Sequence, residues 1–399
     1  MNVIIVGGGA AGFFTAINIA EKNPNWNIEI LEKSNKLLSK VKVSGGGRCN
    51  VTNARSKPSE LIHFYPRGHK KLYNVFSKFN SSDMVNWLRD HGVETHTESD
   101  LRMFPVSNNS QTIIDCFVNT AREHGVKITL NCGITKISRT DQGWSLQTAD
   151  GVKAAQRLIV TTGSSPQSWK ILHEAGLDIV PPVPSLFTFN IKDPRLNGLM
   201  GITFAEAKVK IVGSKMIESG PLLITHWGLS GPAILKLSAW GARDLEKVNY
   251  NFQIAISFVG ELGSEQTKQQ IIEQRALNPK RKVLNYPLFD LPKRFWEQIC
   301  SYCEINDTLV FGELPNKQIN KLTEELAQGL YSVKGKSTFK EEFVTSGGVK
   351  LSEINLDTFE AKRLPGLYLA GEVLDIDALT GGFNFQACWS GGWMIAQNF

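Results

Sequence analysis

The chain has 399 residues, of which 42% are hydrophobic and 21% are charged, which is the composition of an ordinary soluble globular protein with two or three domains. The net charge of +6 comes from 44 basic and 38 acidic residues, and residues 280–282 form the one tight basic run. This small, scattered excess favours a solvated surface over a nucleic-acid-binding face, so no nucleic-acid partner is expected. No apolar run approaches the roughly 18 residues of a membrane helix. No basic region precedes the first apolar residues, so a signal peptide is not expected either.

Six cysteines are spread irregularly along the chain. Cys300 and Cys303 form a CxxC pair, but no second pair and no histidine at ligand spacing accompanies it, so no metal site is expected. The pair also lies in a predicted helix, unlike a redox CxxC. The remaining thiols are typical of a reduced, cytoplasmic protein.

The first elements along the chain form one βαβ unit. Residues 3–6 are continuously apolar, as in a central parallel strand. Residues 10–22 have helical periodicity and stop before Asn23-Pro24, and residues 28–31 form a second strand. This order of strand, glycine turn, helix and strand is typical of nucleotide-binding α/β domains.

Further helices and strands follow up to about residue 185. Helices are predicted over residues 82–88, capped by Ser82, and over 111–124. Strands are predicted over residues 127–130, 143–147 and 157–160, with an Asp150-Gly151 hairpin turn between the last two.

The pattern changes after the prolines at residues 181–184. Residues 186–262 alternate short strands and turns, and residues 263–335 have a helical pattern. Beyond residue 343 apolar strands and glycines return, with a strand at 367–370 and a last helix over 384–397. The insert is therefore expected to occupy residues 186–344, within a discontinuous domain of residues 1–185 and 345–399.

Residues 7–12, Gly-Gly-Gly-Ala-Ala-Gly, fit the GxGxxG fingerprint of dinucleotide binding. Gly7 permits the tight turn, Gly9 allows a pyrophosphate to approach the backbone, and Gly12 allows close packing of helix on strand. Phosphate would bind the free N–H groups at the helix start. Glu32 ends the second strand at the position where an acid binds ribose hydroxyls, which favours NAD or the adenosine half of FAD over NADP.

The C-terminal region distinguishes between these two cofactors. Gly371 and Glu372 follow the apolar strand at 367–370, and Thr380-Gly381-Gly382-Phe383-Asn384 opens the last helix. Flavin folds of the glutathione-reductase type end in this way, with the acid on the ribityl chain and the helix N-terminus facing the flavin, where it stabilises the negative charge of the reduced ring. The expected cofactor is therefore FAD.

A third glycine-rich segment covers residues 44–53, Ser-Gly-Gly-Gly-Arg-Cys-Asn-Val-Thr-Asn. Its glycines permit close backbone approach to a ligand. Arg48 would pair with pyrophosphate, and Asn50 and Asn53 would bond flavin or substrate. Cys49 is either redox-active or, as the favoured reading, a small residue packed beneath the loop.

These segments resemble the BaiN-like flavoproteins, a family that includes proteins described as bile-acid reductases and as aminoacetone oxidases. Further matching segments are residues 102–107, 225–232 and 345–349, so the resemblance covers essentially the whole chain. It implies non-covalently bound FAD and a Rossmann-like FAD domain of the glutathione-reductase type, interrupted by an insert with a β-barrel-like part and a helical part that covers the flavin. The chain departs from the family at Leu38 and Leu101, where glycine is usual, and at Ser164, where the glycine-rich stretch that normally follows is missing.

The motifs and the resemblance together give the expected site. His226, between Thr225 and Trp227, is the candidate for proton transfer, with a purely structural histidine as the alternative. The expected cofactor-binding residues are Gly7, Gly9, Ala10, Ala11, Gly12, Glu32, Lys33, Lys40, Ser44, Gly46, Gly47, Arg48, Cys49, Asn50, Ile134, Thr162, Gly163, Gly371, Glu372, Asp375, Gly381, Gly382, Phe383 and Asn384.

Three functions are compatible with this site. The first is an FAD-dependent reductase that transfers hydride at flavin N5 to a small organic substrate and takes electrons from a transiently bound NAD(P)H. The second is an oxidase or dehydrogenase of an amine or hydroxy acid. The third is a non-catalytic FAD-binding redox sensor or RNA-associated factor. The sequence has no second GxGxxG, so a dedicated NAD domain is not expected.

Overall fold

The computed structural model describes residues 1–337 and 344–399. The chain divides into two compact units, one made of Met1–Val183 with Lys340–Phe399 and the other of Pro184–Phe339. The end of the expected insert, residues 338–343, lies outside the described residues. Each unit has its own hydrophobic core.

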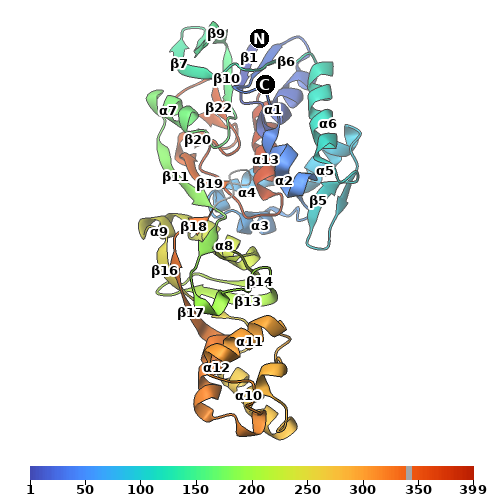
Figure 1. Ribbon diagram of the computed structural model, residues 1–399. Coiled ribbons are helices and arrows are strands. Elements are labelled where there is room, and N and C mark those ends of the chain that lie inside the picture. The colour runs from blue at the N-terminus through green and yellow to red at the C-terminus, as the bar shows by residue number, and fades with distance from the viewer. Residues whose placement is uncertain (338–343) are drawn as a thin grey trace. The chain divides into compact units, whose positions relative to one another are not determined.

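The first unit is built on a seven-stranded sheet (Figure 1). Five neighbouring strands are parallel, and two short strands extend one edge in antiparallel pairing. The central strand β1 is buried from Val3 to Val6, which explains its continuous apolar run. In spatial order the strands are β20 (Ile354–Asn355), β21 (Glu360–Ala361), β22 (Leu367–Leu369), β10 (Arg157–Val160), β1 (Asn2–Val6), β2 (Asn27–Leu31) and β6 (Lys127–Thr129).

The sheet joins segments from both ends of the chain, because β22 pairs with β10 and β10 pairs with β1. Helices α1 and α13 pack side by side (Figure 1). Their backbones approach closely at Gly392, where a Cβ atom would lie 2.6 Å from the Thr15 hydroxyl oxygen. The helices of this unit are α1 (Ala10–Lys22), α2 (Ser39–Gly47), α3 (Pro58–Leu61), α4 (Tyr73–Lys78), α5 (Ser81–Asp90), α6 (Ser110–Glu123), α7 (Pro166–Glu174) and α13 (Phe383–Ala396).

Smaller sheets complete the unit. Two have three strands each, and β11 (Ile179–Ser185) pairs with β19 (Val344–Val349). The Asp150-Gly151 turn joins β8 to β9 and not to β10, so the predicted hairpin is wrong, because a short strand lies between the two predicted ones. The three-stranded sheets contain β3 (Thr52–Asn53), β5 (Arg102–Pro105) and β4 (Thr95–Thr97), and β7 (Ile134–Thr140), β8 (Gly143–Thr148) and β9 (Gly151–Ala155).

One predicted helix start also needs correction. Asn80, and not Ser82, caps α5, because its side-chain oxygen accepts from the Ser82 N–H at 2.9 Å. Asp83 reciprocates by accepting from the Asn80 N–H at 2.7 Å. This capping box satisfies donors that the helix itself leaves unpaired.

The second unit contains an antiparallel sheet that closes on itself. Its edge strands β17 and β18 are consecutive in the chain and are joined at Gly335, while β18 pairs with β12 at the other end of the strand order. In spatial order the strands are β17 (Gly329–Lys334), β16 (Asn251–Ser257), β13 (Thr203–Ile211), β14 (Ile217–Ile224), β15 (Gly228–Ser230), β12 (Thr188–Asn190) and β18 (Lys336–Ser337). This is the β-barrel-like part of the insert.

The helices of this unit do not follow the predicted division completely. Two of them fall within the strand-rich stretch, and the last ends at Gln328, after which residues 329–337 return to the sheet. None of the helices in the described ranges has the length and apolar character needed to cross a membrane. The helices are α8 (Pro232–Trp240), α9 (Ala242–Lys247), α10 (Ser264–Leu277), α11 (Lys293–Tyr302) and α12 (Asn316–Gln328).

Candidate FAD site and its relatives

The glycine loop between β1 and α1 has the geometry that a dinucleotide requires. Gly7 has φ +114°, and a Cβ atom on it would lie 2.5 Å from the Thr161 carbonyl oxygen. A Cβ atom on Gly12 would lie 2.0 Å from the Gly7 carbonyl oxygen, whereas one on Gly9 would meet no atom within 4 Å. Gly7 and Gly12 therefore serve the turn and the packing, while Gly9 leaves open space at the start of α1, beside Ala10 and Ala11.

The expected adenosine-binding residues lie together at the carboxyl end of β2. The Glu32 carboxylate accepts from the Gly8 N–H and from the Ser34 N–H and hydroxyl, each at 2.9 Å. The Glu32 carbonyl accepts from the Cys132 N–H at 2.8 Å. This contact brings the loop before Ile134 against Lys33. An ionised carboxylate has about four acceptor sites, so Glu32 can still accept from a ribose hydroxyl.

The third glycine-rich segment breaks α2. Ser44 has extended geometry (ψ 146°), and Gly45 and Gly46 are left-handed, with φ 58° and 68°. Cβ atoms on Gly46 and Gly47 would meet nothing within 4 Å, so this stretch of backbone is open to a ligand. Cys49 is fully buried, and burial raises the pKa of its thiol to about 12. The geometry favours packing over redox chemistry for this cysteine.

Arg48 and Asn50 have protein partners in the structure. The Arg48 guanidinium pairs with Glu98 at 2.6 Å and lies 4.0 Å from the centre of the Phe104 ring. With its amide oriented to satisfy both neighbours, Asn50 donates to the Thr52 carbonyl and accepts from the Gly382 N–H, each at 3.0 Å. Asn50 thus links the third segment to the start of α13.

The C-terminal glycines lie directly against that segment. A Cβ atom on Gly382, at φ 88°, would lie 2.5 Å from the Thr52 carbonyl oxygen. The Asn53 amide donates to the Gly381 carbonyl at 3.1 Å. Phe383 is buried and stacks on Phe64 with ring centres 4.1 Å apart. These contacts hold the N-terminus of α13 in place beside the third segment.

Two other predicted C-terminal residues, Asn384 and Asp375, form hydrogen bonds to the protein backbone. The Asn384 amide donates to the Ala378 carbonyl at 3.0 Å and accepts from its N–H at 2.9 Å, which fixes the loop before α13. The Asp375 N–H donates to the Val349 carbonyl at 2.9 Å.

Glu372 follows β22 and forms an ion pair with Lys40. The Lys40 ammonium also lies 3.4 Å from the Ser164 hydroxyl, and the Glu372 carboxylate faces Gly163. Gly371 has φ 80° and packs near Ala11, which brings the two ends of the chain together at one edge of the sheet.

These residues fit FAD. The loops after β1, β2, β10 and β22 meet at the carboxyl ends of parallel strands, where nucleotides bind in open α/β sheets. Thr162, after β10, has a buried hydroxyl oxygen without a hydrogen-bond partner among the described residues. Such groups are usually satisfied, so this hydroxyl has bonding capacity left for a cofactor. The open backbone at Gly9, Gly46 and Gly47 leaves space beside it.

His226 belongs to the second unit, at the turn between β14 and β15. The Thr225 N–H donates to the Gly228 carbonyl at 2.8 Å, and the Ile191 N–H donates to the Trp227 carbonyl at the same distance. The turn is therefore fixed, while His226 is exposed and the Trp227 side chain is 60% exposed. The geometry presents an accessible imidazole and not a packed one.

The family assignment follows from the match of residues 1–398 to the model of the HI0933-like protein Rossmann domain. The chain belongs to this family. It is 28% identical to a ribosomal RNA dihydrouridine synthase of Escherichia coli (strain K12), over 100% of this chain and 97% of that protein. It is 23% identical to a 3-dehydro-bile acid delta(4,6)-reductase of Clostridium scindens, over 98% of this chain and 97% of that protein, which confirms the resemblance to BaiN-like flavoproteins.

Solved structures confirm the fold class. A 3-ketosteroid-delta4-(5alpha)-dehydrogenase from Rhodococcus jostii RHA1 matches with a TM-score of 0.51 at 13% identity, over 99% of this chain and 96% of that one. The present chain is an FAD-dependent oxidoreductase with a Rossmann-type domain and a sheet-rich insert.

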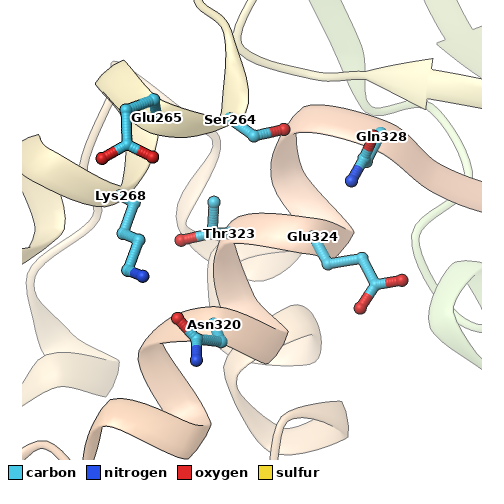
Figure 2. Close-up of a pocket in the computed structure, with 7 residues that line it drawn as sticks. All are labelled: Ser264, Glu265, Lys268, Asn320, Thr323, Glu324 and Gln328. Carbon is cyan, nitrogen blue, oxygen red and sulfur yellow. The ribbon is translucent and has the colours of Figure 1, made fainter.

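The second unit of the present chain has a polar pocket of about 330 Å³ between α10 and α12 (Figure 2). None of the predicted site residues lines it, and every lining side chain is polar or charged. Catalytic ligand pockets are mostly apolar, so this pocket does not resemble one. Its lining residues are Ser264, Glu265, Lys268, Asn320, Thr323, Glu324 and Gln328.

Sequence reasoning missed several residues that shape the candidate FAD site. Phe64 stacks on Phe383, and Tyr65 donates to the Phe383 carbonyl at 2.6 Å. Glu98 neutralises Arg48. Buried Asp377 pairs with Arg67. These partners are far apart in sequence; the only local signal was the aromatic and basic character of residues 63–71.

Proposed function

We propose that this flavoprotein reduces a carbon–carbon double bond conjugated to a carbonyl group, with NAD(P)H as electron donor, and that its substrate is a uracil base in ribosomal RNA. One observation carries the proposal: two relatives matched over nearly their full lengths are named for adding hydrogen to such a bond. Dihydrouridine is uridine with the ring double bond next to a carbonyl saturated. A 3-dehydro bile acid with delta(4,6) unsaturation has its double bonds conjugated to a ketone.

The choice of RNA over a steroid follows the higher identity, 28% against 23%. A second relative with the RNA-directed name, from Haemophilus influenzae, is 25% identical over 98% of this chain. The small net charge led the sequence analysis to expect no nucleic-acid partner, and the RNA proposal replaces that expectation with one that can be tested.

The chain's own residues support reduction through flavin and not through thiols. Bound FAD would supply the hydride. Burial raises the pKa values of Cys49, Cys303 and Cys388 to about 12, so these thiols stay protonated near neutral pH and do not relay electrons. The N–H groups at the start of the 14-residue helix α13 stabilise negative charge, which favours the reduced cofactor.

The reduced substrate also needs a proton at the carbon next to its carbonyl group. We propose His226 as the donor, because its imidazole is exposed on a turn with a fixed backbone and an imidazole is the side chain that most often transfers protons in enzymes. The neighbouring exposed Trp227 offers a flat surface on which a base can stack.

Anaerobic stopped-flow mixing of the FAD-loaded protein with NADH or NADPH tests the electron donor. We expect rapid bleaching of the flavin with at least one of them. An unmodified ribosomal RNA transcript should then restore the flavin colour and gain dihydrouridine, measured by mass spectrometry of its nucleosides. A conjugated 3-keto steroid serves as the comparison substrate.

His226→Gln separates the two half-reactions. Bleaching by the nicotinamide should be unchanged, while reoxidation by the substrate slows by about 10²-fold or more, as for loss of a general acid. Equal reoxidation rates in both proteins would exclude His226 as the donor. Absence of bleaching, with peroxide formed when amines are added, would refute the reductase and favour an oxidase.

A further inference from the structure

The helical part of the second unit carries a rigid, unpaired basic segment, defined here as residues 280–282. Lys280, Arg281 and Lys282 are all exposed. None of the three forms an ion pair within the described residues, whereas exposed lysines such as Lys170 and Lys247 each have an acidic neighbour.

The backbone of the basic segment is held by one facing segment, residues 309–311. Lys282 forms a β-bridge with Val310. The Phe311 N–H donates to the Arg281 carbonyl, and the Val283 N–H donates to the Leu309 carbonyl, both at 3.0 Å. Val283 and Phe311 are fully buried and anchor this pairing in the core. The three cations therefore project from a backbone that is already fixed, and little backbone entropy is lost on binding.

The surroundings of the basic segment suit an anionic polymer with flat bases. The facing segment, residues 309–312, is Leu-Val-Phe-Gly and carries no charge that would neutralise the cations. The Arg281 guanidinium lies 4.6 Å from the centre of the Tyr286 ring, which is partly exposed. Basic side chains next to an aromatic ring bind the phosphates of single-stranded nucleic acid and stack on its bases.

We infer that the basic segment with Tyr286 is the RNA-docking surface of this protein. The inference rests on the proposed RNA substrate and adds the part of the chain that holds the RNA outside the reaction site. Each of the three exposed cations can contact a phosphate, and the Tyr286 ring beside Arg281 offers a base a surface to stack on. An acidic lipid surface is the competing partner, because it would attract the same cations without stacking a base on the Tyr286 ring.

The test compares the FAD-loaded protein with a variant that carries Lys280→Gln, Arg281→Gln and Lys282→Gln. Binding of a fluorescein-labelled, uridine-containing RNA is measured by anisotropy at several salt concentrations. Each phosphate contact on a single strand contributes about 0.7 to the slope of log affinity against log salt, so the slope should fall by about 2. Flavin content and bleaching by NAD(P)H should be unchanged, which shows that the variant is folded.

The matched control carries Lys57→Gln, Lys170→Gln and Lys247→Gln. It removes the same charge from exposed lysines that each have an acidic neighbour. We expect its RNA affinity and salt slope to stay close to those of the parent protein. An equal loss in both variants would mean that only net charge matters and would overturn the docking surface.

Two more outcomes separate the docking surface from the proposed function. If the parent protein reduces uridine in RNA and the basic-segment variant binds RNA equally well, the docking surface is wrong and the proposed function stands. If the parent protein shows no RNA binding, the RNA substrate itself fails. Tyr286→Leu should weaken RNA binding but not binding to phosphatidylcholine vesicles containing phosphatidylserine; the reverse result would assign the segment to a membrane.

Discussion

Gly9→Ala and Gly12→Ala test the role of each glycine in the loop that we propose binds the pyrophosphate. A methyl group on Gly9 meets no protein atom within 4 Å, and Gly9 has φ −98°, which any residue adopts. The apo protein should therefore lose only about 1 kcal/mol or less, the difference between glycine and alanine at a helix N-cap. The methyl group would, however, occupy the space through which a phosphate reaches the N–H groups of α1.

The expected loss falls on cofactor affinity. A hydrogen bond to a charged group contributes about 1.5–3 kcal/mol, so displacing one phosphate contact should weaken FAD binding about tenfold to a hundredfold. Titration of the apo protein with FAD, followed by quenching of flavin fluorescence, measures this change. Urea unfolding of the same apo protein measures stability.

Gly12→Ala should instead lower the stability of the apo protein. Its methyl group would lie 2.0 Å from the Gly7 carbonyl oxygen, so the helix must move away from the strand. We expect a loss of stability of about 1–3 kcal/mol, as for other overpacked sites. If Gly9→Ala binds FAD as tightly as the parent protein, the pyrophosphate does not approach the backbone at Gly9, and the reasoning about the loop is refuted.

Three more predictions concern backbone strain, pH and charge. Leu101 has φ 71° and is partly exposed, so Leu101→Gly should raise the free energy of unfolding by up to about 1 kcal/mol. Leu38 has φ 52° but is only 1% exposed, so Leu38→Gly removes a buried side chain. It should lower the free energy of unfolding by about 2 kcal/mol or more in the same urea titration. Burial opposes the charged form of His91, but its hydrogen bonds to Glu21 and to a backbone carbonyl outweigh this and raise its pKa. The resulting stability is present below about pH 6.5, the ordinary histidine pKa, and is lost as the pH rises through the raised pKa. His91→Gln should therefore flatten the curve of stability against pH in this range. An unchanged curve would contradict this prediction. Lys40→Met should weaken FAD binding by at most about fivefold, since the cation is half exposed, and a loss that persists at high salt would argue against a charge effect.

The parts of the FAD site that depend on local backbone geometry were predictable from the sequence. Gly7, Gly9 and Gly12 have the distinct surroundings that the fingerprint assigns to them, and Glu32 lies next to Gly8 as the spacing requires. Even the departures from the family are informative, because Leu38 retains the left-handed backbone that glycine adopts without strain.

Side-chain partners were not predictable in the same way. Arg48 is the residue type that binds pyrophosphate, but the fold places Glu98 against it from 50 positions away. Asn384 is equally suited to a ligand or to the backbone, and here its amide is taken up by Ala378. The short strand β9 was missed because its five residues lack a strong alternating pattern.

The pairing of β22 with β10, far apart in the chain, also sets the order in which the protein can mature. The loop at Gly7 leaves the ribosome well before Gly371 and Gly382, which lie far behind it in the chain. The unit of Pro184–Phe339 has its own core and can fold before β22 has been synthesised and has paired with β10. The proposed FAD site needs both glycine segments, so it can form only after α13 has been synthesised. A nascent chain that stalls in the insert should therefore carry no flavin.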